Sequence, residues 1–149
     1  MDVRNQINRY FSLLREWNAT YEEYAKSVGL SYTQLLILHT IHDTENCTQK
    51  VLCDICFLPK QTVNIAVTAF YKQGLVTLEE APNDRRTKTI LFTPKGEKFV
   101  QSVLTAVKRD EIAAMNALSP DQQTQLLDLT EKYVRNCMEN LQKLTKREA

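Results

Sequence analysis

The sequence of 149 residues has little glycine and proline, with three Gly and four Pro. Because these residues interrupt helices and strands, their scarcity predicts that most of the chain lies in regular elements. All three glycines lie next to expected helix ends, so none remains to form a glycine-rich phosphate-binding loop. The sequence also lacks a recognisable nucleophile motif and a paired metal-ligand motif. We therefore expect a protein that is not an enzyme and needs no cofactor.

The sequence contains no apolar run long enough for a secretory signal or a membrane span. This absence favours a cytoplasmic protein with no membrane contact. The four cysteines, at positions 47, 53, 56 and 137, are then expected to be thiols rather than disulfides. A chain of this length can bury enough apolar surface to fold without disulfides or metals.

The chain has almost no net charge, +1 at neutral pH, so its total charge gives no argument for binding nucleic acid. The distribution of charge is more informative. Six basic and three acidic residues lie between Pro59 and Gly96, which gives this stretch a net charge of +3. Positive charge is therefore concentrated in the middle of the chain, and the remainder is slightly acidic.

Apolar residues spaced by three and four predict helices over most of the chain. The expected helices lie at about 3–28, 31–43, 48–57, 59–73 and 93–117, with a last one from 119 onward. Ser31 and Ser119 are suitable N-caps, and Gln122 completes a capping box with Ser119. Pro59 suits the first turn of its helix, and Gly74 suits the left-handed position that follows.

The spacing changes from helical to alternating after Gly74. The segments LVTLEE (75–80) and TILFT (89–93) are interpreted as two short strands. The connecting segment APNDRRTK contains the turn residues Pro82, Asn83 and Asp84 together with basic side chains. This region predicts a β-hairpin with a basic tip.

Both terminal helices carry an apolar seam, which is typical of a helix that packs against another helix. In the first helix the seam consists of Ile7, Tyr10, Leu14, Trp17, Tyr21, Tyr24 and Val28. In the last helix it consists of Leu126, Thr130, Tyr133, Cys137, Leu141 and Leu144. A single small domain cannot fully bury both seams, so we expect a homodimer formed through the ends of the chain.

Three stretches in the middle of the chain have informative sequences. They are LPKQTVNIAVTAFYKQGLV (58–76), NDRRTKTILFTPKGE (83–97) and LSYTQLLILHTI (30–41). They resemble, in this order, the recognition helix, the wing and the second helix of the MarR family of bacterial regulators. The resemblance implies a mostly α fold with a small β-hairpin wing, a winged helix-turn-helix with N- and C-terminal dimerisation helices. The chain 1–149 would then contain a DNA-binding lobe at 30–96 and a helical dimerisation lobe at 1–29 and 97–149.

The resemblance predicts a sequence-specific regulator that binds double-stranded DNA. A recognition helix enters the major groove with its N-terminal residues against the base edges. The candidate base-reading residues are Lys60, Gln61, Thr62 and Asn64. Glutamine and asparagine can bind adenine through two hydrogen bonds, and lysine can reach guanine or a phosphate. A dimer with two-fold symmetry would bind a palindromic operator.

The wing supplies a second candidate DNA contact through Arg85, Arg86 and Lys88. Arginine can enter a narrow minor groove, and lysine can pair with phosphates. The resemblance implies that Asp84 holds a wing arginine in position, a role we assign to Asp84 and Arg86. Arg85 is then the candidate for the minor-groove contact, although the residues alone leave the two arginine roles interchangeable.

The resemblance also implies a small aromatic or anionic effector, bound between the dimerisation helices and the DNA-binding lobe. Trp17, Tyr21 and His39 are the candidate lining residues of such a pocket. Repression that the effector relieves is the usual behaviour of the family, and we expect it here.

Two alternatives for the same fold depend on cysteine and histidine. Cys53 and Cys56 form a Cys-x-x-Cys pair, which can belong to a redox or zinc site, but no second pair exists to complete a zinc site. Against the family pattern both cysteines fall at packed positions, so we expect core residues and no metal. His39 and His42 leave a metal-sensing regulator open. A third alternative is a winged-helix interaction module without DNA binding.

Overall fold

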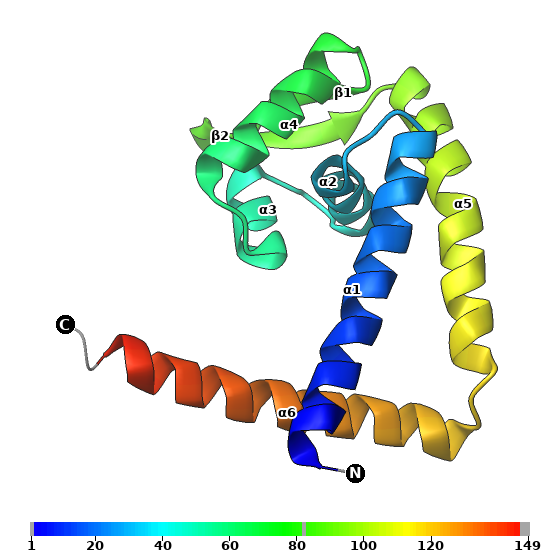
Figure 1. Cartoon of the computed structure of the whole chain (residues 1–149). Helices are drawn as coiled ribbons and strands as arrows, with labels where there is room; N and C mark the ends of the chain where they lie inside the picture. The colour runs from blue at the N-terminus through cyan, green and yellow to red at the C-terminus, as the bar shows by residue number, and fades with distance from the viewer. Residues whose placement is uncertain (1, 82, 147–149) are drawn as a thin grey trace. The chain divides into compact units, whose positions relative to one another are not determined.

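The structure, a computed structural model, describes residues 2–81 and 83–146. In this part of the chain it has six helices and one antiparallel hairpin (Figure 1). The helices are α1 (Val3–Ser27), α2 (Tyr32–Asp43), α3 (Gln49–Cys56), α4 (Lys60–Lys72), α5 (Pro94–Asn116) and α6 (Pro120–Thr145), and the strands are β1 (Val76–Ala81) and β2 (Asp84–Phe92). The predicted fold class, mostly helical with a small hairpin, is confirmed.

Local capping explains where the helices begin and end. Ser31 and Ser119 each form the full capping box, with Gln34 and Gln122 respectively. Gly74 follows α4 with a φ of +71°, a left-handed conformation that glycine adopts without a steric penalty. The expected helix boundaries are thus reproduced to within a few residues.

Two details of the helix-turn-helix differ from expectation. Pro59 is the N-cap of α4 rather than a residue of its first turn, and its carbonyl accepts a hydrogen bond from the Val63 N–H at 3.2 Å. Phe57 ends α3 in a left-handed conformation with a φ of 53°, which is unfavourable for a bulky residue. Its ring is 91% exposed, so burial of the side chain does not offset this strain.

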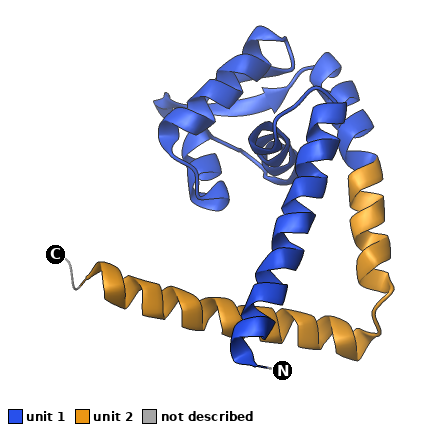
Figure 2. Ribbon diagram, viewed as in Figure 1, with its two compact units in different colours: residues 1–105 blue, residues 106–149 orange. Residues whose placement is uncertain are grey.

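The chain divides into two compact units, residues 1–105 and 106–149 (Figure 2). The buried apolar core of the described chain lies entirely in the first unit. Its largest fully buried side chains include Phe70, Ile37, Leu38, Leu52 and Val100. These residues come from α2, α3, α4 and α5, so a single core fixes the helix-turn-helix.

The first unit is larger than the lobe 30–96 expected from the sequence, because α1 and the start of α5 share its core. Ala25 of α1 is fully buried, and Val103 and Leu104 of α5 are buried as well. The Tyr24 hydroxyl donates a hydrogen bond to the Val103 carbonyl at 2.5 Å. The separate roles assigned to residues 30–96 and to the flanking segments remain predictions.

The wing is a longer hairpin than expected, because β2 extends back to Asp84. The segment 81–88 was expected to be a loop, but Glu80 pairs with Lys88 and Ala81 pairs with Asp84, with a register shift between Glu80 and Ala81. The turn residue Pro82 lies outside the described residues. Strand pairing therefore continues through most of the basic segment.

The wing is fixed to the helix-turn-helix at its inner end. The Ile90 N–H donates a hydrogen bond to the Cys47 carbonyl at 2.8 Å, and Thr48 forms an isolated antiparallel bridge with Thr89. Ile90 and Cys47 are both buried. The two residues that precede α3, Cys47 and Thr48, therefore extend the backbone pairing of the hairpin.

The second unit contains the end of α5 and all of α6. The Gln123 side-chain amide donates to the carbonyls of Met115 and Leu118 at 3.0 and 3.1 Å, which orders the connection between the two helices. None of the residues from Pro120 to Thr145, all of which the structure describes, is buried. Within residues 2–81 and 83–146, no helix is long and apolar enough to cross a membrane.

Gly96 is a position where the fold has no room for a side chain. A Cβ atom there would lie 1.9 Å from the Leu75 carbonyl oxygen. This oxygen already accepts a hydrogen bond from the Thr93 N–H at 3.0 Å, so it cannot move without breaking that bond. Gly96→Ala should therefore lower the free energy of unfolding by about 1–3 kcal/mol. Urea denaturation at a fixed protein concentration measures the change.

The control is Gln101→Ala, at an exposed position of the same helix, which should change the free energy of unfolding by less than about 0.5 kcal/mol. Equal stability of the Gly96 and Gln101 variants would contradict the packing argument.

Candidate nucleic-acid interface

Helix α4 has one buried face and one exposed face. Its buried residues are Val63, Ala66, Val67 and Phe70. Among the predicted base-reading residues, Lys60, Gln61 and Asn64 are exposed and Thr62 is half-buried. Burial at helical spacing therefore leaves the N-terminal half of α4 with its polar side chains directed to solvent, as a base-reading helix requires.

Asn64 is held by a residue that the sequence did not suggest. The Asn64 amide donates a hydrogen bond to the side-chain oxygen of Gln49, the first residue of α3, at 3.3 Å. No sequence signal identifies this pair, because it depends on how α3 packs against α4.

Ile65 is a second residue that sequence reasoning missed. It follows Asn64 on the exposed face, and 62% of its surface is accessible. It lies one helical turn after Gln61, so the two side chains share a face of α4. The four-residue spacing from Gln61 could have identified Ile65 as an exposed residue, although isoleucine is more often buried.

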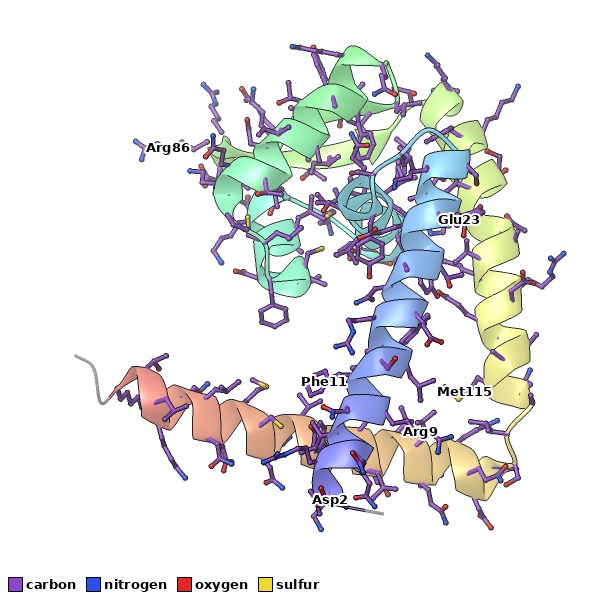
Figure 3. All side chains as sticks on the ribbon, viewed as in Figure 1. Asp2, Arg9, Phe11, Glu23, Arg86 and Met115 are labelled. Carbon is purple, nitrogen blue, oxygen red and sulfur yellow. The ribbon has the colours of Figure 1, made fainter. Side chains whose placement is uncertain are left out.

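On the wing, Arg85, Arg86 and Lys88 are exposed and lie in β2. Arg86 extends outward from the hairpin (Figure 3). Asp84 contacts this segment through the backbone of Arg86 and the side chain of Thr87. Its carboxylate accepts hydrogen bonds from the Arg86 backbone N–H and the Thr87 hydroxyl, both at 2.9 Å. The Asp84 contact thus fixes the turn of the backbone at Arg86 and Thr87.

The recognition helix and the wing meet at one hollow of about 280 Å³. The lining residues come from α3, α4 and both strands, and half of them are cationic. They are Thr48, Gln49, Lys50, Lys60, Leu78, Arg86, Thr87 and Lys88. Lys50 is partly neutralised by an ion pair with Asp54 at 2.8 Å. The hollow brings together three predicted DNA contacts, namely Lys60, Arg86 and Lys88, and its charge suits a phosphate group.

The three candidate effector residues lie elsewhere in the first unit. Trp17 and Tyr21 are neighbours on α1, with ring centroids 6.0 Å apart, and Tyr21 lies 6.3 Å from the ring of Tyr32. The His39 ring on α2 contacts the Asp43 carboxylate at 2.9 Å. None of the candidate residues lines the basic hollow. Their role in binding an effector stays a prediction.

The thiol groups differ in their surroundings. Burial raises the pKa of the Cys47 thiol to about 11, which disfavours the reactive thiolate. Cys53 is half-buried and packs against the core, and the half-buried Cys56 shares a hydrogen bond with the Thr40 hydroxyl at 3.3 Å. The Asp43 carboxylate contacts both His39 and His42. The described residues contain no group of three or more His, Cys, Asp or Glu side chains placed to hold a metal ion.

A family model described as MarR family matches residues 28–87, the segment that contains α2, α3, α4 and most of the wing. This segment of the chain is therefore similar to the MarR family. Proteins of this family are transcription regulators rather than enzymes.

Solved structures show that the family's fold extends over nearly the whole chain. A MarR family regulator from Neisseria meningitidis is 19% identical, with a TM-score of 0.77 over 96% of this chain and 99% of that one. The Staphylococcus aureus MarR in complex with salicylate and kanamycin is 21% identical, with a TM-score of 0.71 over 91% and 92% of the two chains. Bordetella bronchiseptica BpsR, whose DNA binding is described as regulated by 6-hydroxynicotinic acid, is 17% identical. Its TM-score is 0.66 over 89% of this chain and 93% of that one. The predicted winged helix-turn-helix fold is confirmed.

The turn at Asp84 gives a pH-dependent prediction. Its two hydrogen bonds, first that from the Arg86 N–H and then that from Thr87, hold the pKa of the Asp84 carboxyl below its usual range. The ionised carboxylate therefore supports the turn at pH values above the ordinary aspartate pKa, and this support disappears as the pH falls through the lowered value. In Thr87→Val, the pKa of Asp84 should rise toward the ordinary value because one donor is lost.

Carboxyl NMR titration of both proteins measures this pKa directly. The control is Thr124→Val, which removes a hydroxyl that donates to the Pro120 carbonyl and not to Asp84, and it should leave the Asp84 midpoint unchanged. An unchanged Asp84 midpoint in Thr87→Val would contradict the assigned contact.

Proposed function

We propose that the chain is a homodimeric, sequence-specific regulator that binds double-stranded DNA through α4 and the wing. The observation that carries the proposal is the shared basic hollow, in which Lys60 of α4 and Arg86 and Lys88 of β2 line one surface. A DNA phosphate seated there would position the exposed end of α4 for the major groove. The chain's low total charge is compatible with this role because its cations are concentrated at that surface.

The two DNA-contacting elements have separate tasks in this proposal. Gln61 and Asn64 are exposed amides on α4 and can pair with adenine edges. Thr62, half-buried beside them, can contribute a single hydrogen bond. Lys60 and Lys88 neutralise phosphates, and Arg85 or Arg86 enters the adjacent minor groove.

Dimerisation would place two such surfaces against a palindromic operator. Several large apolar side chains of α1 are exposed, including Ile7, Phe11 and Trp17. The same holds for α6, where the exposed set includes Leu141 and Leu144. Monomeric proteins seldom expose such rows, so these helices are the proposed interface within residues 1–29 and 97–149.

We also infer that a small aromatic anion releases the protein from DNA, so that it acts as a cytoplasmic repressor. Related structures carry salicylate or are described as regulated by 6-hydroxynicotinic acid, and both compounds are aromatic acids. Trp17 and Tyr21 offer aromatic surface, and His39 offers a ring nitrogen that can donate to a carboxylate.

Base reading and phosphate binding should be separable by mutation. Gln61→Ala should reduce the preference for operator over scrambled duplex, since one bidentate base contact contributes about 1–3 kcal/mol. Lys88→Ala should weaken binding to both duplexes and reduce the slope of log affinity against log salt by about one. Fluorescence anisotropy titrations at several salt concentrations, with an operator selected from a random library, measure both effects.

Lys98→Ala is the matched control, because it removes an exposed lysine of α5 that lies outside the hollow. If Lys88→Ala retains the affinity and salt slope of the control, the wing is not a DNA contact. If wild-type protein selects no sequence from the library, the proposed function is wrong.

The dimer interface is tested with charged residues in the C-terminal seam. Wild-type protein at micromolar concentration should scatter light as a particle of about twice 17.2 kDa. The double variant Leu141→Glu, Leu144→Glu should be monomeric, because four charges would be buried at the two-fold interface. Lys132→Glu introduces the same side chain at an exposed position outside the seam and should remain dimeric. A wild-type monomer, or a dimer in the double variant, would contradict this interface.

A further inference from the structure

We propose that Ile65 recognises the C5 methyl group of a thymine in the major groove, next to the base pair that Gln61 reads. This inference rests on the proposed DNA binding and assigns a specific base feature to one side chain. It concerns the only large aliphatic residue that the fully described helix α4 exposes.

Ile65 has no packing role that explains its presence. Its neighbours Ala66 and Val67 are buried at 4% and 1% exposure, whereas Ile65 itself is 62% exposed. Isoleucine is also a weaker helix former than alanine, lysine or glutamine. Since its branched side chain is nearly fixed at χ1 in a helix, it loses little conformational freedom when it makes a contact. Ile65 is therefore a conformationally restricted apolar side chain on the exposed face of α4.

The surroundings of Ile65 indicate a nucleic acid rather than an apolar peptide as its partner. Gln61 lies one turn earlier on the same face, and helical side chains lean toward the helix N-terminus. Ile65 thus points toward the surface next to Gln61 and Asn64, both exposed amides. Lys60 lies one turn before Asn64, on the flank of this face, and belongs to the hollow that Arg86 and Lys88 also line. An apolar side chain among amides and cations fits the floor of a DNA major groove.

The spacing along α4 gives the order of the contacts. Four residues advance about 6 Å along a helix axis, and base pairs are stacked about 3.4 Å apart. Gln61 and Ile65 can therefore reach base pairs that are one or two steps apart. Among the four bases, thymine alone presents a methyl group in the major groove, and apolar side chains recognise it by contact. An adenine for Gln61 and a thymine for Ile65 would define a short A·T-containing element in each half-site.

Replacing thymine by uracil tests the contact directly, because uracil pairs identically but lacks the methyl group. Each thymine of the selected operator is replaced singly, together with its symmetry mate, and binding is measured by fluorescence anisotropy. For wild-type protein we expect one replacement to weaken binding about four-fold per half-site, the effect of losing burial of one methyl-sized group. Ile65→Ala should bind the thymine operator at least as weakly as wild-type protein binds the uracil operator. It should show no thymine-to-uracil difference at that position. Ile65→Val should retain part of the difference.

Ile55→Ala is the matched control, since it makes the same change at another exposed isoleucine of the same unit, 50% accessible, on α3. It should keep the wild-type thymine-to-uracil ratio. Thermal unfolding followed by circular dichroism confirms that both variants are folded.

Two outcomes would overturn the inference. One is a wild-type protein that binds every uracil operator as tightly as the thymine operator. The other is an Ile65→Ala protein that keeps the wild-type ratio, which would place Ile65 against the DNA backbone or a protein partner. Both differ from failure of the proposed function, in which the wild-type protein already fails to distinguish unmodified operator from scrambled duplex.

Discussion

The hydrogen bond from the Ile90 N–H to the Cys47 carbonyl is the contact on which the candidate interface depends. A two-stranded hairpin is marginally stable alone, and this bond joins it to the residue that precedes the N-cap of α3. Burial of both residues protects the bond from competing water. Arg86 and Lys88 are thereby placed on the same hollow as Lys60. Together with the burial of Val76 and Ile90 in the core, this junction keeps the cations of the wing and of α4 in one compact unit.

Much of the fold follows from local sequence. The capping boxes at Ser31 and Ser119, the left-handed Gly74 and the periodic burial of α4 are short-range features. The sequence predicted the N-cap at Ser31, the capping box at Ser119, the left-handed Gly74 and the buried face of α4, because the deciding residues lie within one or two turns of each other. The part of Gln34 in the Ser31 capping box was not predicted. The exposed polar end of α4 was predicted on the same basis, since it is the complement of the buried face.

The parts that escaped prediction depend on contacts between distant residues or on a competing local preference. The extension of β2 to Asp84 depends on pairing with β1 across a register shift, whereas the turn residues there favoured a loop. The Gln49–Asn64 hydrogen bond joins residues of two helices. Isoleucine is usually a core residue, and only the structure shows that Ile65 is exposed. These three features all lie at the candidate interface, where functional demands compete with local rules.

Phe57 has a consequence for how much mutational change the helix-turn-helix can tolerate. A left-handed phenylalanine at the end of α3, exposed over 91% of its surface, costs on the order of 1–3 kcal/mol in backbone strain. Glycine at the same place would carry neither that strain nor an exposed ring. The lobe therefore operates with a smaller reserve of stability than its core could provide. Fewer mildly destabilising substitutions in α3 and α4 can therefore be combined before the lobe unfolds.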